Sequence, residues 1–259
     1  MIAVLQIFFV LGLIVVIILL VFKPRRHHEV QPLPENLAGL LGDYVEFYRD
    51  LTDDRKTSFV ARVEHFLSTV RITGVNAIVE DIDMVLIGAA AIIPVFSFTD
   101  WQYVNLHEVL VYPGNFNEEF EQSGNERGVT GMVGTGALQH VMIVSKWQLR
   151  QGFISPADHR NTAIHEFVHL IDKMDGTMDG VPEIILERRF VGEWKNVVDE
   201  CITAIRNGTS DIDLYAATSP VEFFAVASEY FFKHPAMMQE RHAALYEMLA
   251  RIYRAGKYG

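Results

Sequence analysis

The pentapeptide His165-Glu166-Phe167-Val168-His169 constrains the fold more than any other feature of the chain. Residues four apart lie on one face of an α-helix, so both imidazoles reach a single metal ion only if this segment is helical. Apolar residues flank it on both sides, Ala163-Ile164 and Leu170-Ile171, which predicts a buried helix. Two unpartnered imidazoles on a buried helix are costly to desolvate, and this favours a metal site over a helix that carries two histidines by chance.

Glu166 lies beside the face that carries His165 and His169. Zinc lowers the pKa of a bound water to about 7, and a carboxylate in this position can take the proton, which leaves a hydroxide for attack on a carbonyl. The pattern therefore predicts a zinc metallopeptidase that hydrolyses peptide bonds, with Glu166 as its general base. The pentapeptide alone is only moderately specific, so the rest of the chain must supply context.

A catalytic zinc site of this kind needs a third protein ligand, and the sequence offers three candidates. Asp175 stands where an extended form of the motif places its last ligand, but Asp172 occupies the position at which that form requires glycine. Glu222 and Glu229 lie two turns apart on one later predicted helix, so spacing does not separate them. The segment Ser219-Pro-Val-Glu222 also fits a capping box, which would explain Glu222 without a metal.

The first residues of the chain predict a membrane anchor. Residues 2–22 form an apolar run with one polar member, Gln6, which is long enough to cross roughly 30 Å of hydrocarbon. The run lacks the basic start, the short apolar core and the cleavage site of a signal peptide. Lys23, Arg25 and Arg26 follow it, so the positive-inside rule places the remainder in the cytoplasm. We expect an anchor at 1–22, a basic, proline-containing linker at 23–36 and a single domain at 37–259.

The composition excludes nucleic acid as a partner. The formal net charge is -11, and no basic stripe with interleaved aromatic residues follows the short stub after the apolar run. The single cysteine, Cys201, allows no disulfide within the chain, which suits a reducing compartment.

Periodicity predicts an α+β domain, mostly helical with a small sheet. We expect helices at 37–50 and 53–70, with Thr52 as an N-cap, and a buried core helix in the apolar run 84–98, which Pro94 interrupts. Residues 109–112 and 141–144 predict strands around an irregular hairpin or loop, and either strand could hold a substrate backbone by edge pairing. Later helices are expected at about 158–174, 183–206, 219–233 and 236–254.

Several blocks of sequence, taken in order, resemble the Mlc titration factor A family of zinc peptidases. They are Leu106-His-Glu-Val-Leu-Val-Tyr-Pro113, Asn161-Thr-Ala-Ile-His-Glu-Phe-Val-His-Leu-Ile-Asp172, Asp213-Leu-Tyr-Ala-Ala217, Ser219-Pro-Val-Glu-Phe-Phe-Ala225 and Ser228-Glu-Tyr-Phe-Phe232. The resemblance implies a zincin-like fold in which Glu222 is the third ligand and Tyr215 faces the zinc. A phenol there could donate to the oxyanion of a tetrahedral intermediate, while the alternative for Tyr215 is a packed tyrosine at a helix entry.

The family is named for binding a glucose-responsive transcriptional repressor, so the resemblance also implies a transcriptional regulator as a partner. The apolar run at 2–22 departs from the family pattern.

The alternative function is a zinc-stabilised binding module with little or no hydrolytic activity. Glu166 favours the peptidase, because zinc binding does not require it. Glu229 and Asp172 could orient the imidazoles or face solvent, and His107 is expected to be a core or surface residue rather than a ligand.

Overall fold

The structure is a computed structural model that describes residues 32–117, 121–122, 128–155 and 159–254. The anchor expected at 1–22 and most of the linker expected at 23–36 lie outside these residues. Within the described ranges, no helix has both the length and the apolar character that crossing a membrane requires. The residues from Gln31 onward form one compact unit.

Three helices open this unit: α2 (Leu37–Tyr44), α3 (Glu46–Arg49) and α4 (Asp53–Thr69). A single helix was expected over 37–50, but the extended backbone of the buried residue Val45 separates α2 from α3. Thr52 takes the expected N-cap position of α4, although its side chain caps no amide among the described residues. Helix α4 buries Phe59, Val63 and Phe66 on one face, as its periodicity predicts.

The apolar run at 84–98 is a buried core helix, as predicted. It forms α5 (Asp81–Ile92) and a closing 3₁₀ turn, η1 (Ile93–Val95), which contains Pro94. The Glu80 side chain caps the start of α5, and the buried carboxylate of Asp83 completes the capping box.

The small sheet has four strands, β1 (Arg71–Gly74), β2 (Glu108–Tyr112), β3 (Gly131–Val133) and β4 (Val141–Ser145), in the order β1-β2-β4-β3. The strands expected at 109–112 and 141–144 are present, and they pair with each other in parallel. The hairpin is made by β3, which lies in the glycine-rich stretch and pairs antiparallel with β4. In the described sheet, β2 and β4 are therefore both interior strands, so the expectation that either offers a free edge to a substrate is wrong.

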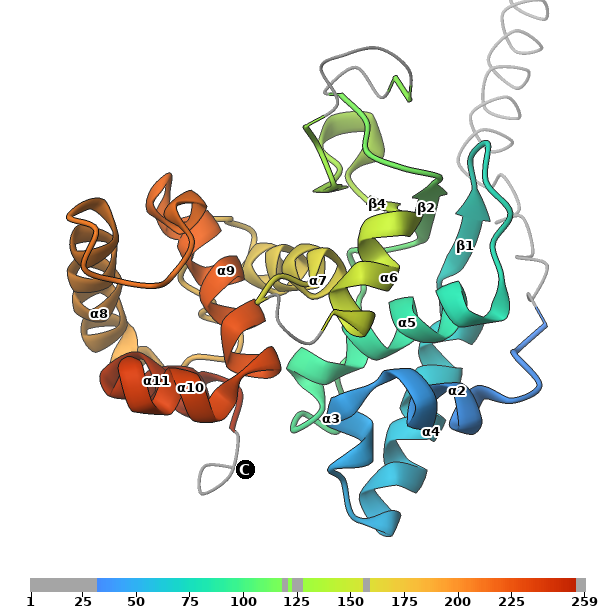
Figure 1. The fold of residues 1–259 in the computed structure, drawn as a ribbon, viewed down its shortest axis with the longest axis horizontal. Helices are drawn as coiled ribbons and strands as arrows, with labels where there is room; N and C mark the ends of the chain where they lie inside the picture. Colours follow the sequence, from blue (N-terminus) through green and yellow to red (C-terminus); the bar gives the residue numbers. More distant parts are fainter. Residues whose placement is uncertain (1–31, 118–120, 123–127, 156–158, 255–259) are drawn as a thin grey trace, which may run out of the picture. The chain divides into compact units, whose positions relative to one another are not determined.

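The second half of the unit is helical (Figure 1). Its elements are α6 (Lys146–Ile154), α7 (Thr162–Asp172), η3 (Lys173–Asp175), η4 (Arg188–Phe190), α8 (Val191–Arg206), η5 (Leu214–Ala217), α9 (Pro220–Lys233), α10 (Pro235–Arg241) and α11 (Ala243–Ile252). Helix α6 was not predicted. Helix α8 begins later than expected, and His242 divides the helix expected at 236–254 into α10 and α11.

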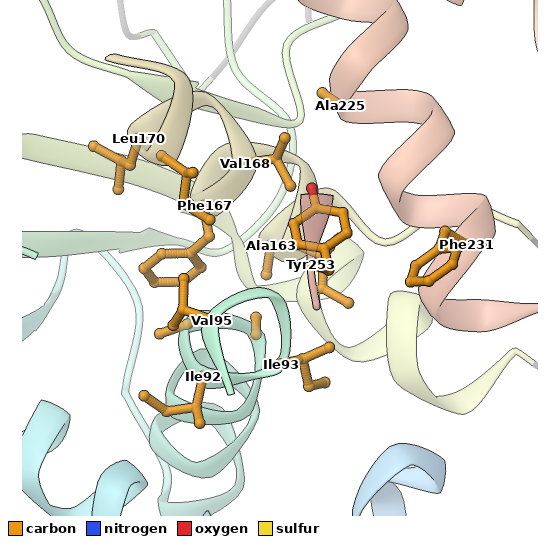
Figure 2. Close-up of a cluster of buried hydrophobic side chains, with 14 of the residues drawn as sticks. Ile92, Ile93, Val95, Ala163, Phe167, Val168, Leu170, Ala225, Phe231 and Tyr253 are labelled. Carbon is orange, nitrogen blue, oxygen red and sulfur yellow. The ribbon is translucent and has the colours of Figure 1, made fainter. Parts of the chain in front are cut away.

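Helix α7 carries the pentapeptide and lies between α9 on one side and α5, η1 and the sheet on the other (Figure 1). Phe167 is fully buried, with its ring 5.2 Å from that of Tyr103 and 5.6 Å from that of Phe66, measured between centroids. Figure 2 shows the same apolar side of α7 against Ile92 and Val95. Burying a side chain such as Phe167 stabilises the fold by about 1.5–3 kcal/mol, so packing fixes the direction in which the two histidines point.

Candidate metal centre

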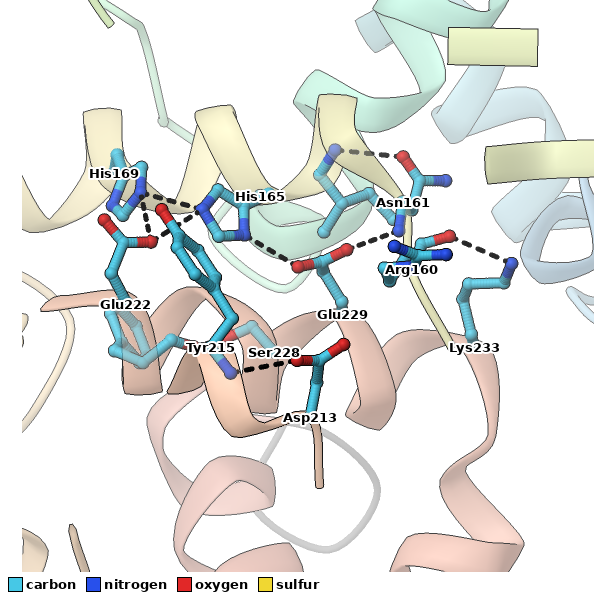
Figure 3. Close-up of polar contacts among 12 residues, drawn as sticks. Arg160, Asn161, His165, His169, Asp213, Tyr215, Glu222, Ser228, Glu229 and Lys233 are labelled. Atoms are coloured by element: carbon cyan, nitrogen blue, oxygen red, sulfur yellow. Dashed lines mark hydrogen bonds and ion pairs between the residues drawn. The ribbon is translucent and has the colours of Figure 1, made fainter. Parts of the chain in front are cut away.

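Asn161 starts helix α7 and so sets the position of the first histidine. Its side-chain oxygen accepts a hydrogen bond of 3.1 Å from the Ile164 amide, as an N-cap does. His165 and His169 then project from one face, and their Nε2 atoms lie 3.0 Å apart (Figure 3). The spacing argument is confirmed, because the two imidazoles converge on one point.

Glu222 reaches the same point from the first turn of α9. Its Oε2 atom lies 3.0 Å from Nε2 of His165 and 3.5 Å from Nε2 of His169. Ser219 caps α9 by accepting the backbone amide of Glu222 at 3.2 Å, so the cap uses the main chain of Glu222 and leaves its carboxylate for the site. Capping and metal binding are therefore compatible at this residue.

The donor atoms fit a catalytic zinc ion. Ligand atoms bound tetrahedrally at about 2.0–2.1 Å stand roughly 3.3 Å from one another, close to the separations seen here. Two imidazole nitrogens and one carboxylate oxygen are also a common set of ligands in zinc hydrolases. Such a set leaves the fourth coordination position of the zinc open for water or substrate. Among the described residues, His165, His169 and Glu222 are the one group of histidine, cysteine and acidic side chains that could hold a metal.

The charges at this point shift the pKa values of His165 and Glu222 in opposite directions. Burial alone would lower the pKa of His165, but Glu229 and Glu222 outweigh it and raise that pKa well above its usual value. Burial would raise the pKa of Glu222, yet its hydrogen bonds to His165 and His169 hold it well below the usual range. The carboxylate of Glu222 is therefore ionised and available as a ligand.

Glu166 lies beside the metal-binding face and beneath strand β3. It is 5% exposed, and a Cβ atom added to Gly131 would meet its Oε1 at 2.7 Å. Burial raises the pKa of Glu166, and the positive charges of His165 and His169 offset part of this effect. A raised pKa suits a carboxylate that must first accept and then release a proton.

Tyr215 stands on η5, on the α9 side of the site. Its ring centroid is 6.2 Å from that of His165, and the Asp213 carboxylate accepts the Tyr215 amide at 2.9 Å, which fixes the turn. The residue is 52% exposed, so it is not packed in the core. Burial of the hydroxyl and the nearby Glu222 carboxylate raise the pKa of Tyr215 to about 12, so the phenol remains a hydrogen-bond donor at neutral pH.

Asp175, a candidate ligand, and the two other residues singled out from the sequence, Asp172 and His107, lie outside the group formed by the three donor atoms. Asp175 is exposed in η3, and its carboxylate accepts the Thr177 amide at 3.0 Å, as in a turn. Asp172 is buried and accepts the Gly180 amide at 2.8 Å. His107 stacks on His140 with centroids 4.4 Å apart.

Glu229 contacts His165 at Nδ1, the ring nitrogen opposite the Nε2 atom that faces Glu222 and His169. The roles of Asn161 and Gly131 were missed from the sequence. The signal for Asn161 was a capping residue directly before the helix, and the signal for Gly131 was a glycine in a short β-forming segment, which marks close approach of another group.

Comparison with known proteins identifies the family of the chain. The family model described as "Glucose-regulated metallo-peptidase M90" matches residues 21–254. An uncharacterised protein of Synechocystis sp. is 29% identical over 238 residues, which cover 86% of this chain and 85% of that protein. Mlc titration factor A of Escherichia fergusonii is 31% identical over 222 residues, covering 81% and 82% of the two chains.

Mlc titration factor A of Salmonella arizonae is 30% identical over 242 residues, covering 87% of this chain and 94% of the relative. The family model and these relatives all match over most of the chain, so the resemblance read from the sequence blocks is confirmed. This chain belongs to the glucose-regulated metallo-peptidase M90 family, together with the Mlc titration factors A.

Proposed function

We propose that this protein is a zinc-dependent peptidase that hydrolyses peptide bonds at the site formed by α7 and α9. The observation that carries the proposal is the convergence of three donor atoms, on His165, His169 and Glu222, beside the buried carboxylate of Glu166. A zinc ion bound there would supply a water of lowered pKa and would polarise a substrate carbonyl.

The side chains around this point have separate tasks in the proposed reaction. Glu166 accepts a proton from the attacking water and returns it to the leaving amine, as a general base and then a general acid. Tyr215 donates its hydroxyl to the oxygen on which negative charge develops. Both groups act mainly on the transition state, so their loss is expected to lower turnover more than substrate affinity.

Strand β3 is the proposed binding edge for the substrate backbone. The Ser145 amide donates to the Thr130 carbonyl and the Gly134 amide donates to the Val141 carbonyl. Thr130 and Gly134 therefore both face β4. In an antiparallel pair every second residue faces the partner strand, so Met132 does too, whereas Gly131 and Val133 turn their amides and carbonyls outward. Gly131 and Val133 therefore offer backbone groups to an extended peptide directly beside Glu166.

Capture of a protein partner is a second candidate function. Its support is the name shared by the relatives, Mlc titration factor A, which implies that those proteins titrate a regulator. A regulator bound as a partner would not need Glu166 to accept a proton, so substitution of Glu166 separates the two functions.

We further propose that residues 2–22 anchor the protein in a membrane with the peptidase domain in the cytoplasm. The support is the apolar run and the three basic residues that follow it. A topology reporter fused after Gly259 should be active in the cytoplasm. Activity only on the opposite side would reverse the orientation.

Metal analysis tests the zinc assignment. The purified protein should contain one zinc per chain, and His165→Ala should lose it because one of three ligands is gone. His107→Ala is the matched control, since His107 stacks on His140 away from the site and its loss should leave the zinc in place. Absence of zinc from the wild type, or full occupancy in His165→Ala, would contradict the assignment.

A further inference from the structure

Glu229 is a buried carboxylate that the proposed reaction does not use. It lies on α9, two turns beyond Glu222, and is 3% exposed. Both of its oxygens face donors at the start of α7: Oε1 lies 2.7 Å from Nδ1 of His165, and Oε2 accepts the backbone amide of Asn161 (Figure 3). A buried acidic group with each oxygen assigned to a different donor has a specific structural task.

We propose that Glu229 is a positioning residue that fixes the orientation and the tautomer of His165 for metal binding. The inference rests on the proposed zinc site. An ionised carboxylate accepts hydrogen bonds and donates none, so Nδ1 must carry the ring proton in this contact. In the neutral ring that binds a metal, the lone pair is then on Nε2, the nitrogen that points at Glu222 and His169. A ligating histidine held in this way keeps its ring orientation and becomes a better donor to the metal.

The contact with Asn161 prevents the carboxylate of Glu229 from rotating. The Asn161 side chain caps α7 through Ile164 and also donates to the Gly152 carbonyl at 3.2 Å, so the backbone at this residue is held from two sides. The Asn161 amide therefore offers a fixed donor to Oε2. With one oxygen held there, the other is directed at His165.

His169 has no equivalent support. Its Nδ1 atom is buried and has no hydrogen-bond partner among the described residues. Among the described residues, a carboxylate therefore contacts Nδ1 of His165 but not Nδ1 of His169, and that carboxylate belongs to Glu229. Removing this contact should weaken metal binding even though all three ligands remain.

The substitution Glu229→Gln keeps the shape of the side chain but replaces one of its two acceptor oxygens by a donor, so it tests whether both acceptors are needed. The amide has one oxygen, but two donors face it. If that oxygen accepts from Asn161, the amide nitrogen faces Nδ1 of His165, which must then accept, and the proton moves to Nε2, where it blocks metal binding. If the oxygen accepts from His165, two donors oppose each other at Asn161, which leaves a buried amide unsatisfied.

The measurement is zinc affinity of the full chain by competition with a chromogenic chelator, with the visible absorption of the cobalt-substituted protein as a second readout. Glu229→Gln should lower zinc affinity about 10- to 100-fold and change the cobalt spectrum. Ser228→Ala is the matched control, because Ser228 precedes Glu229, is fully buried and bonds Tyr253 at 2.6 Å. That variant should lower the thermal midpoint and keep wild-type zinc affinity.

Wild-type affinity and an unchanged cobalt spectrum in Glu229→Gln would overturn the proposal, as would an equal loss of affinity in Ser228→Ala. If Glu229→Gln does not fold, Glu229→Asp carries the test, since it keeps two acceptors on a shorter side chain. Undiminished zinc affinity there would equally overturn the proposal. Failure of the wild type to bind zinc is a different result, because it contradicts the proposed function itself.

Discussion

His165 lies between two carboxylates of one helix, with Glu222 at Nε2 and Glu229 at Nδ1. The two glutamates are separated by two helical turns, so their spacing left the choice of ligand open, and the resemblance to the family implied Glu222. The structure distinguishes them by the ring nitrogen that each one contacts. Spacing could predict the pair His165 and His169 because one helix sets their geometry, whereas the third ligand depends on how α9 packs against α7.

Metal affinity should depend on pH through His165. Its pKa is raised in the folded, metal-free protein, so the proton adds stability that is complete below the unfolded pKa of about 6.5. That contribution is lost as pH rises through the folded pKa. Zinc competes with this proton, so zinc affinity should increase with pH across the same window. Titrations with a chelator at several pH values would measure it, and an affinity that is constant above about pH 6.5 would contradict the coupling.

Tyr215→Phe should lower kcat by about 10²-fold and leave KM nearly unchanged, because the phenol is proposed to act on the developing oxyanion. The half-exposed ring stays in place, so the fold and the zinc should be retained. Steady-state kinetics on a peptide substrate measure the split. Tyr44→Phe, which alters an exposed tyrosine of α2, is the control. A raised KM at constant kcat would show that Tyr215 binds substrate instead.

Two short elements near the site, β3 and α6, escaped prediction from the sequence for physical reasons. Strand β3 is three residues long and contains Gly131, so it shows no alternation of apolar and polar side chains. Helix α6 depends on its context, because Lys146 and Arg150 form ion pairs with the buried Asp83 of α5 at 3.2 and 2.7 Å. Longer elements such as α4, α5 and α9 were predicted because their apolar faces repeat over several turns.

Gly131→Ala should reduce peptide hydrolysis without removing zinc. The new Cβ would lie 2.7 Å from Oε1 of Glu166 and 2.8 Å from Cγ2 of Thr162, so either the strand or the general base must shift. A displacement of about 1 Å at a reacting group can lower the rate about 10²-fold. Gly114→Ala is the control, because nothing lies within 4 Å of a Cβ at that glycine. Equal activity of both variants would show that β3 does not approach Glu166 closely.

At the scale of the whole molecule, the α+β class and the small sheet were predicted correctly, whereas the sequence analysis predicted no strand order. Parallel pairing of β2 with β4 joins segments distant in sequence, which no local pattern records. The candidate site forms where α7 packs against α9, which in turn contacts η5, so its residues come together only through tertiary packing. The convergence of His165, His169 and Glu222 was predictable, because the motif and the resemblance to a family carry information that local periodicity lacks.

The central claim is that this site hydrolyses peptide bonds with Glu166 as the proton acceptor. The most direct test compares hydrolysis of a peptide library by the wild type and by Glu166→Gln, with zinc content measured in both and with a chelator-treated wild type as the reference. Glu166→Gln should keep its zinc and fold while hydrolysis falls about 10²-fold or more, and chelation should abolish the wild-type activity. Undiminished hydrolysis by zinc-loaded Glu166→Gln, or activity that survives complete removal of zinc, would contradict the account.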